Sequence, residues 1–231
     1  PVSTEYTATR TSIRTALILT LFASLFTAAM ALTYRYTKPD IDAAVAEVKR
    51  KLIAEVLTPD SYDNALLTDT VVVAAPAALG VDEGSVVYRA RKNGEPVALI
   101  VEARAPDGYG GGIDLVVAVG ADGRLTGVRT TSHKETPGLG DYIDPRKDPN
   151  KTQPWVGQFV GRGLGEGDAS HWRVRKDGGD FDARAGATIS ARAVVAATAR
   201  ALAYAEANQH RLFDARTGER LSDAATGEAK P

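Results

Sequence analysis

An uncharged stretch of 20 residues, positions 15–34, most constrains what this chain can fold into. As a helix rising about 1.5 Å per residue, the stretch spans the roughly 30 Å hydrocarbon core of a bilayer. Arg14 and Arg35 flank it, and Tyr34 and Tyr36 stand where an interfacial aromatic belt would lie. The sequence therefore predicts a transmembrane helix over residues 15–36, preceded by an N-terminal tail of residues 1–14.

A cleaved signal peptide is the alternative interpretation of this segment. Residues 29–31, Ala-Met-Ala, have the small-x-small form of a cleavage site. We expect the segment to be kept as an anchor. Arg10 and Arg14 precede it while Arg35 and Lys38 follow it, so loop charge gives almost no orientation bias. A short tail before a large downstream domain fits a signal-anchor, and we expect a single-pass protein of the bacterial inner (cytoplasmic) membrane with its soluble domain in the periplasm.

The composition limits the available chemistry. The absence of cysteine removes disulfides, iron–sulfur ligation and thiol nucleophiles together. His133, His171 and His210 have no ligand-like spacing, so we predict no metal site. With 28 basic and 29 acidic residues and no long basic run, the chain is not expected to bind nucleic acid. Any redox chemistry must come from an organic cofactor.

The remaining residues favour an α+β fold. Apolar residues at positions 45, 48, 52 and 56 predict a helix that opens at Asp40 and is closed by Pro59, either a stalk or a core-packing helix. Short β-branched runs predict strands at residues 70–73, 85–90, 97–103, 113–119 and 125–131. Asp122-Gly123 between the last two runs is a hairpin signal. We expect a soluble domain over residues 37–212, with an antiparallel sheet and flanking helices, and a flexible tail over residues 213–231.

The segment at residues 182–190 combines a corner with a helix start. It reads Asp-Ala-Arg-Ala-Gly-Ala-Thr-Ile-Ser and runs into an Ala-rich helix predicted over residues 190–208. A helix N-terminus presents free N–H groups and about half a positive charge, so a phosphate could be held beside Thr188. A plain helix cap by Thr188 or Ser190 is the alternative.

Two other loops carry polar or flexible residues. Residues 132–140 follow a strand and place a cation, an anion, a hydroxyl and an imidazole within four positions, a density typical of ligand-facing loops. Glycines at residues 108–112 would allow close approach to a flat ligand, although a tight turn needs the same glycines. The Gly-rich residues 161–167 lack the strand and helix of a dinucleotide-binding fingerprint, and we interpret them as a flexible loop.

These motifs together resemble a known family. Residues 133–140 (His-Lys-Glu-Thr-Pro-Gly-Leu-Gly), 176–182 (Lys-Asp-Gly-Gly-Asp-Phe-Asp) and 186–190 (Gly-Ala-Thr-Ile-Ser) occur in order after Tyr62-Asp63-Asn64 and the N-terminal span. The chain resembles the FMN-binding domain family shared by RnfG, of the Rnf electron-transport complex, and NqrC, of the sodium-translocating NADH:quinone reductase. The resemblance is closest to RnfG and covers the chain up to about Asn208.

The resemblance implies a covalent flavin. In the family, FMN is joined through its phosphate to the threonine of the Gly-Ala-Thr motif, here Thr188. A separate magnesium-dependent flavin transferase uses FAD and reads the preceding residues, here 182–187. Ala185 departs from the Ser or Thr often found there, but it is not the acceptor, so attachment should survive.

The resemblance also implies the surroundings and partners of the flavin. The expected cofactor-binding residues are Thr188, Gly186, Ala187, Ser190, Glu135, Thr136, Gly138 and Leu139, and Trp172 and residues 108–112 are further candidates to line the ring. We expect a redox subunit of an Rnf-type ferredoxin:NAD oxidoreductase that translocates ions, contacting membrane lipid and an RnfD-like flavin-bearing subunit. A regulatory or maturation flavodomain, an NqrC-like quinone reductase subunit and a cofactor-free binding domain remain alternatives.

Overall fold

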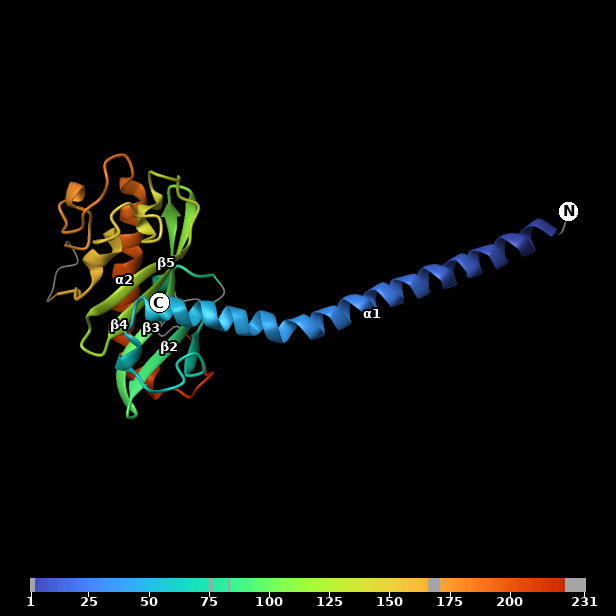
Figure 1. Ribbon diagram of the computed structural model, residues 1–231, viewed down its shortest axis with the longest axis horizontal. Helices are drawn as coiled ribbons and strands as arrows, with labels where there is room; N and C mark the ends of the chain where they lie inside the picture. The colour runs from blue at the N-terminus through green and yellow to red at the C-terminus, as the bar shows by residue number, and fades with distance from the viewer. Residues whose placement is uncertain (1–2, 75–76, 83, 166–170, 223–231) are drawn as a thin grey trace, which may run out of the picture. The chain divides into compact units, whose positions relative to one another are not determined.

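The computed structural model describes residues 3–74, 77–82, 84–165 and 171–222 (Figure 1). These residues form two units that meet in sequence between Lys49 and Arg50, and each is considered by itself. The first unit is the greater part of one long helix. The second unit is the domain that carries all the predicted site residues.

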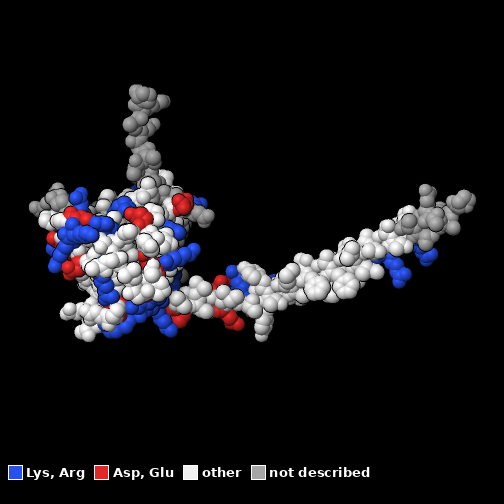
Figure 2. All heavy atoms as spheres, turned by 90° about the horizontal axis from the view of Figure 1, so that it is seen from above, with Lys and Arg blue, Asp and Glu red and all other residues white. Residues whose placement is uncertain are grey.

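The helix α1 (Ser3–Ala54) is continuous over 52 residues. Two helices separated before Asp40 were expected, but α1 passes through Pro39 without interruption. A proline inside a helix removes one backbone hydrogen bond and leaves the others available, so a long apolar helix can absorb it. Among the described residues, α1 is the one helix long and apolar enough to cross a membrane. Its middle carries no charged side chain (Figure 2).

A six-stranded sheet forms the centre of the second unit. Its strands are β1 (Thr70–Val73), β2 (Ser85–Lys92), β3 (Glu95–Gly108), β4 (Gly111–Gly120), β5 (Leu125–Ser132) and β6 (Arg220–Leu221), in the spatial order β5-β4-β3-β2-β1-β6. Neighbours from β1 to β5 are antiparallel, and the hairpin predicted at Asp122-Gly123 joins β4 to β5. The five predicted strands are confirmed.

The C-terminal part differs from the predicted tail. Phe213 lies in α2 (Thr188–Asp214), and β6 pairs in parallel with β1, which makes the sheet mixed. The Val72 N–H donates to the Glu219 carbonyl at 2.9 Å. Residues 213–222 are therefore part of the domain, and residues 223–231 of the predicted tail lie outside the described residues.

Two apolar layers cover the two faces of the sheet. Alternate residues of β3 divide between them: Leu99 and Val101 face a core shared with α2, whereas Ile100 faces a smaller core. The smaller core includes Ile53, in the last turn of α1, and Val56, just after the helix ends. Burial on both faces explains why the middle of β3 is apolar without alternation.

The helix α2 packs along β3 and β4 and places its first turn at one end of the sheet (Figure 1). It begins two residues earlier than the sequence predicted. Between β5 and α2 the chain forms short 3-10 turns and connecting loops. The 3-10 turns in the described residues are η1 (Pro59–Ser61), η2 (Ala77–Leu79), η3 (Asp141–Ile143), η4 (Trp155–Phe159) and η6 (Arg175–Asp177).

Candidate functional site

Thr188 is the first residue of α2 and is half-buried. The cap position belongs to Ala187, which has no side chain able to cap, so the alternative of Thr188 as the helix cap is wrong. Gly186 precedes it with a φ of 82°, a conformation that favours glycine. Within the described part of the chain the Thr188 hydroxyl has no hydrogen-bond partner. A hydroxyl without a partner thus lies at the positive end of a 27-residue helix.

A hydrogen-bond network fixes the corner before Thr188. The Tyr142 hydroxyl donates to the Ala187 carbonyl and accepts from the Arg184 N–H, both at 3.2 Å. The Arg184 guanidinium lies 4.7 Å from the Tyr142 ring centre and donates to the buried Asp148 carboxylate at 2.5 Å. Burial raises the pKa of the Tyr142 hydroxyl, which therefore keeps its proton as a donor.

Glu135 joins three segments beside the start of α2. Its carboxylate is buried and accepts hydrogen bonds from the Ser190 hydroxyl and, at 2.9 Å, from the Gly110 N–H of the β3–β4 turn. Gly140 lies against the same group, since a Cβ there would stand 2.6 Å from Ser190 Oγ. Glu135 therefore brings together the three segments predicted to face the cofactor: the polar loop, the glycine-rich turn and the start of α2.

The tip of the polar loop, residues 136–139, lies on the surface. Thr136 accepts from the N–H groups of Leu139 and Gly140 through its carbonyl, which closes a tight turn with Gly138 at φ 73°. Leu139 is 45% exposed and lies near Gly186, where a Cβ would be 3.6 Å from Leu139 Cδ1. Thr136 and Gly138 are exposed on the outer side of this turn.

Trp172 does not line this site. Its side chain is buried in an aromatic group, with ring centres 4.9 Å from Phe181 and 6.3 Å from Phe159. Trp172 therefore belongs to the core, contrary to the expectation that it lines a flavin ring. Tyr109, at the tip of the β3–β4 turn, is instead 69% exposed. Of the expected flexible loop, residues 161–165 are described. Gly161 and Arg162 exchange backbone hydrogen bonds with Leu125, while residues 166 and 167 lie outside the described residues.

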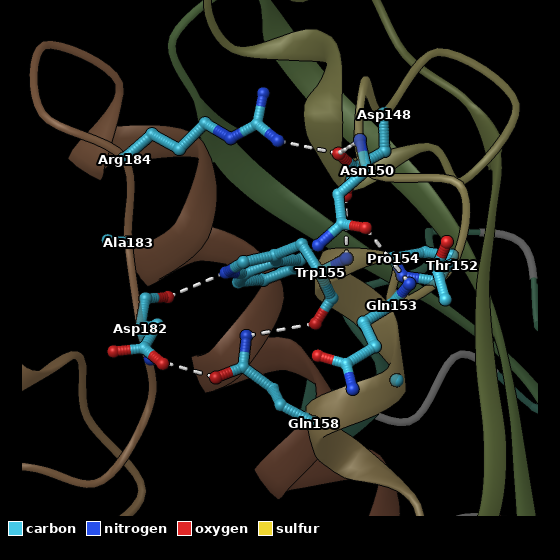
Figure 3. A pocket seen from close by; sticks show the side chains of 11 residues that line it. Asp148, Asn150, Thr152, Gln153, Pro154, Trp155, Gln158, Asp182, Ala183 and Arg184 are labelled. Atoms are coloured by element: carbon cyan, nitrogen blue, oxygen red, sulfur yellow. Dashed lines mark hydrogen bonds and ion pairs between the residues drawn. The ribbon is translucent and has the colours of Figure 1, made fainter.

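A pocket of about 690 Å³ lies beside the segment that leads to Thr188. Figure 3 shows the Trp155 indole N–H donating to the Asp182 carbonyl at 2.6 Å and Gln158 accepting from the Asp182 N–H at 2.8 Å. None of the eight predicted cofactor residues lines this pocket. The sequence did not predict that this segment is supported by Trp155, Gln158 and Asp148. Each residue type is evident in the sequence, but the contacts between these residues and the segment are not.

His133 is held as a neutral side chain under the polar loop. Its Nδ1 accepts from the Glu135 N–H at 3.2 Å, and its Nε2 lies 3.9 Å from the buried Asp144 carboxylate. Burial lowers the pKa of His133, and the charge of Lys147 adds to this effect. No cluster of His, Cys, Asp and Glu suited to a metal occurs among the described residues.

Comparisons with known proteins cover both units. A family model described as an FMN-binding domain matches residues 108–203, and one described as the RnfG N-terminal region matches residues 7–56. The G subunit of an ion-translocating oxidoreductase complex from Pseudomonas aeruginosa is 47% identical over 88% of this chain and 93% of its own length. The corresponding protein of Pseudoalteromonas atlantica is 43% identical over 86% of this chain and 90% of its own length. The crystal structure of Shewanella oneidensis NqrC aligns with a TM-score of 0.40 at 21% identity, covering 63% of this chain and 64% of that one.

The sequence matches and the local structure agree. The FMN-binding domain match contains the β3–β4 turn, the polar loop and the start of α2, which the hydrogen bonds of Glu135 bring together. The N-terminal match contains the apolar helix that is long enough to cross a membrane. The chain belongs to the family of G subunits of ion-translocating oxidoreductase complexes.

Proposed function

We propose that this chain is a membrane-anchored electron-transfer subunit that carries FMN attached covalently to Thr188. The observation that carries the proposal is the Thr188 hydroxyl, which lies half-buried at the start of α2, within the matched FMN-binding domain. It has no hydrogen-bond partner among the described residues. The small residues Ala185, Gly186 and Ala187 leave room for a phosphate beside it. FMN supplies the chemistry of accepting and donating electrons when bound.

The attachment forms one phosphate ester bond and breaks one phosphoanhydride bond. The Thr188 oxygen bonds to the phosphorus of the FMN half of FAD, the diphosphate linkage breaks, and AMP leaves while the hydroxyl proton passes to the transferase. The resulting phosphodiester anion lies beside free N–H groups of the first turn of α2, which stabilise it by hydrogen bonding and by the helix dipole. A covalent link also prevents loss of the cofactor outside the cytoplasm.

The surface around Thr188 suits a ring that exchanges electrons with a partner. Leu139 and Ile189 expose large side chains near Thr188. Tyr109 exposes another on the β3–β4 turn, which Glu135 joins to the site through the Gly110 N–H. An exposed flavin over these side chains could be approached closely by a second redox centre. Gly186, Ala187, Ser190, Glu135, Thr136 and Gly138 complete the set of residues proposed to contact or support it.

The finer assignment follows the family. We propose an Rnf-type complex that couples ferredoxin and NAD redox chemistry to ion translocation, with an RnfD-like flavin subunit as neighbour and a flavin transferase as maturation enzyme. One membrane pass over residues 15–36 would leave residues 1–14 in the cytoplasm and the domain from residue 37 in the periplasm.

Thr188→Val tests the attachment site, because valine keeps the branched shape and removes the hydroxyl. The full-length protein is produced together with a flavin transferase, and covalent flavin is measured by intact mass and by fluorescence of the denatured chain. We expect the wild type to carry one FMN and Thr188→Val to carry none, while the same change at an exposed threonine of β5, Thr131→Val, keeps the flavin. Covalent flavin on Thr188→Val would refute the site, and a wild-type chain without flavin would refute the function.

A further inference from the structure

Glu135 is a buried side chain whose carboxylate is approached closely by two glycines. A Cβ added to Gly140 would stand 2.9 Å from one carboxylate oxygen, and a Cβ added to Gly108 would stand 2.8 Å from the other. The Glu135 side chain is therefore confined from the loop side and from the β3–β4 turn. With 4% of its surface exposed, it has little contact with water.

The charge of this carboxylate is not neutralised by a basic side chain. Both its hydrogen-bond donors, the Ser190 hydroxyl and the Gly110 N–H, are neutral groups. No Lys, Arg or His of the described residues forms an ion pair with it. Each carboxylate oxygen accepts one hydrogen bond, and burial leaves the field of a charge at this position weakly screened.

The same carboxylate is close to Thr188 through α2. Ser190, which donates to it, is the third residue of the helix, and Thr188 is the first. Both groups therefore lie on the first turn, at the positive end of the helix dipole. A flavin tethered to Thr188 would be held near a fixed negative charge.

We propose that Glu135 is a positioning residue that fastens the polar loop and the β3–β4 turn to the start of α2, and that its charge lowers the reduction potential of a flavin carried on Thr188. This inference rests on the proposed function. Reduction adds negative charge to the flavin, and a buried carboxylate opposes that addition more strongly than an exposed one.

Two substitutions separate the charge from the geometry. Glu135→Gln keeps the length and the acceptor oxygen but removes the charge, whereas Glu135→Asp keeps the charge and loses the reach. Asp114→Asn is the matched control, because it removes from β4 a negative charge that is 41% exposed and paired with Arg104 of the neighbouring strand β3. All are made in the full-length, flavin-loaded protein, after intact mass has established FMN on Thr188 of the wild type.

The midpoint potential is measured by spectroelectrochemistry. We expect Glu135→Gln to shift the potential upward, enough to raise the ratio of reduced to oxidised flavin at fixed ambient potential about tenfold. The shift should persist in about 1 M salt, where the Debye length is about 3 Å. Asp114→Asn and Glu135→Asp should stay at the wild-type potential. Equal potentials for Glu135→Gln and wild type would overturn the electrostatic role.

Limited trypsin cleavage after Lys134 measures the fastening of the loop. We expect Glu135→Asp to be cut severalfold faster than the wild type. Glu135→Gln should be cut at a rate close to the wild type, because its amide oxygen can accept from the Gly110 N–H and its amide NH2 can donate to Ser190 Oγ. Cleavage of Glu135→Asp at the wild-type rate would overturn the positioning role. A wild-type chain that carries no flavin on Thr188 would overturn the proposed function and this inference together, whereas failure of either variant with flavin present overturns the inference alone.

Discussion

The Tyr142 hydroxyl donates to the carbonyl of Ala187 across 45 residues of sequence, at a distance of 3.2 Å. The same oxygen accepts from the Arg184 N–H, so one side chain holds both ends of the corner that precedes Thr188. This corner contains Gly186 in a left-handed conformation. The position of the proposed acceptor hydroxyl therefore depends on a buried aromatic residue of η3.

Tyr142→Phe tests this dependence. The substitution leaves the partly buried Arg184 N–H without its acceptor, and we expect it to lower the free energy of unfolding by about 1–3 kcal/mol. Covalent flavin attachment should also slow, because the corner is no longer fixed. Thermal unfolding of the full-length protein in detergent and the time course of denatured-chain fluorescence are the measurements. Tyr109→Phe, at an exposed position, should leave stability unchanged; equal stability of both variants would contradict the role of Tyr142.

Arg89 supports the opposite end of α2. Its guanidinium is fully buried, pairs with Asp69, and donates to the Leu212 carbonyl at 3.0 Å, one of the last carbonyls of the helix. Arg89→Met removes the cation and leaves buried acceptors without donors, so we expect a loss of about 3–5 kcal/mol. Arg104→Met, which breaks the exposed pair with Asp114, should cost at most about 1 kcal/mol. A similar loss in both variants, measured by thermal unfolding, would contradict this account.

Sequence patterns were sufficient where the determinant is local. The strands are confirmed because β-branched runs and the turn at Asp122-Gly123 act over a few residues. Sequence patterns failed where contacts with distant parts of the chain override the local preference of a residue. Pro39 does not end α1, and Arg220-Leu221 forms a strand only because β1 offers an open edge.

The sequence predicted which loops form the candidate site, but not how these loops contact one another. Thr188 and the polar loop stand out by their residue types, but the hydrogen bond between Glu135 and Ser190 joins positions 55 residues apart. No spacing rule predicts that pairing. Trp172 shows the converse, since an aromatic residue in a polar loop looks like a ligand contact until its neighbours Phe159 and Phe181 are known.

Gly140 is required by close packing and not by its backbone conformation, since its φ is −92°. A Cβ there would stand 2.6 Å from Ser190 Oγ and 2.9 Å from a Glu135 oxygen. We expect Gly140→Ala to cost about 1–3 kcal/mol and to reduce flavin attachment, because the loop must move away from α2. Gly157→Ala is the control, since a Cβ meets nothing within 4 Å there. Thermal unfolding that ranks the two variants equally would be inconsistent with the packing seen around Glu135.

His133 makes stability depend on pH. Burial lowers the pKa of His133 below its ordinary value of 6.5, so the unfolded chain binds a proton more readily than the folded one. The stability contributed by the neutral imidazole is therefore fully present above pH 6.5 and is lost as pH falls through the folded pKa, with a slope of up to about 1.4 kcal/mol per pH unit. Hydrogen bonds from Arg146 overcome the effect of burial and hold the pKa of Asp144 below 3.8. The stability that the Asp144 carboxylate contributes is therefore lost at a lower pH than that of His133.

His133→Asn isolates this contribution, because the asparagine oxygen can accept from the Glu135 N–H in place of Nδ1. Between pH 8 and about pH 5, the wild type should lose stability more steeply than His133→Asn when unfolding is followed at each pH. His171→Asn, at a side chain that is 66% exposed, should keep the steep wild-type profile. Parallel profiles for the wild type and His133→Asn would show that the imidazole is not held neutral by its burial. A steeper wild-type profile would instead link acidification directly to release of the polar loop, because protonated Nδ1 cannot accept the Glu135 N–H that shapes it.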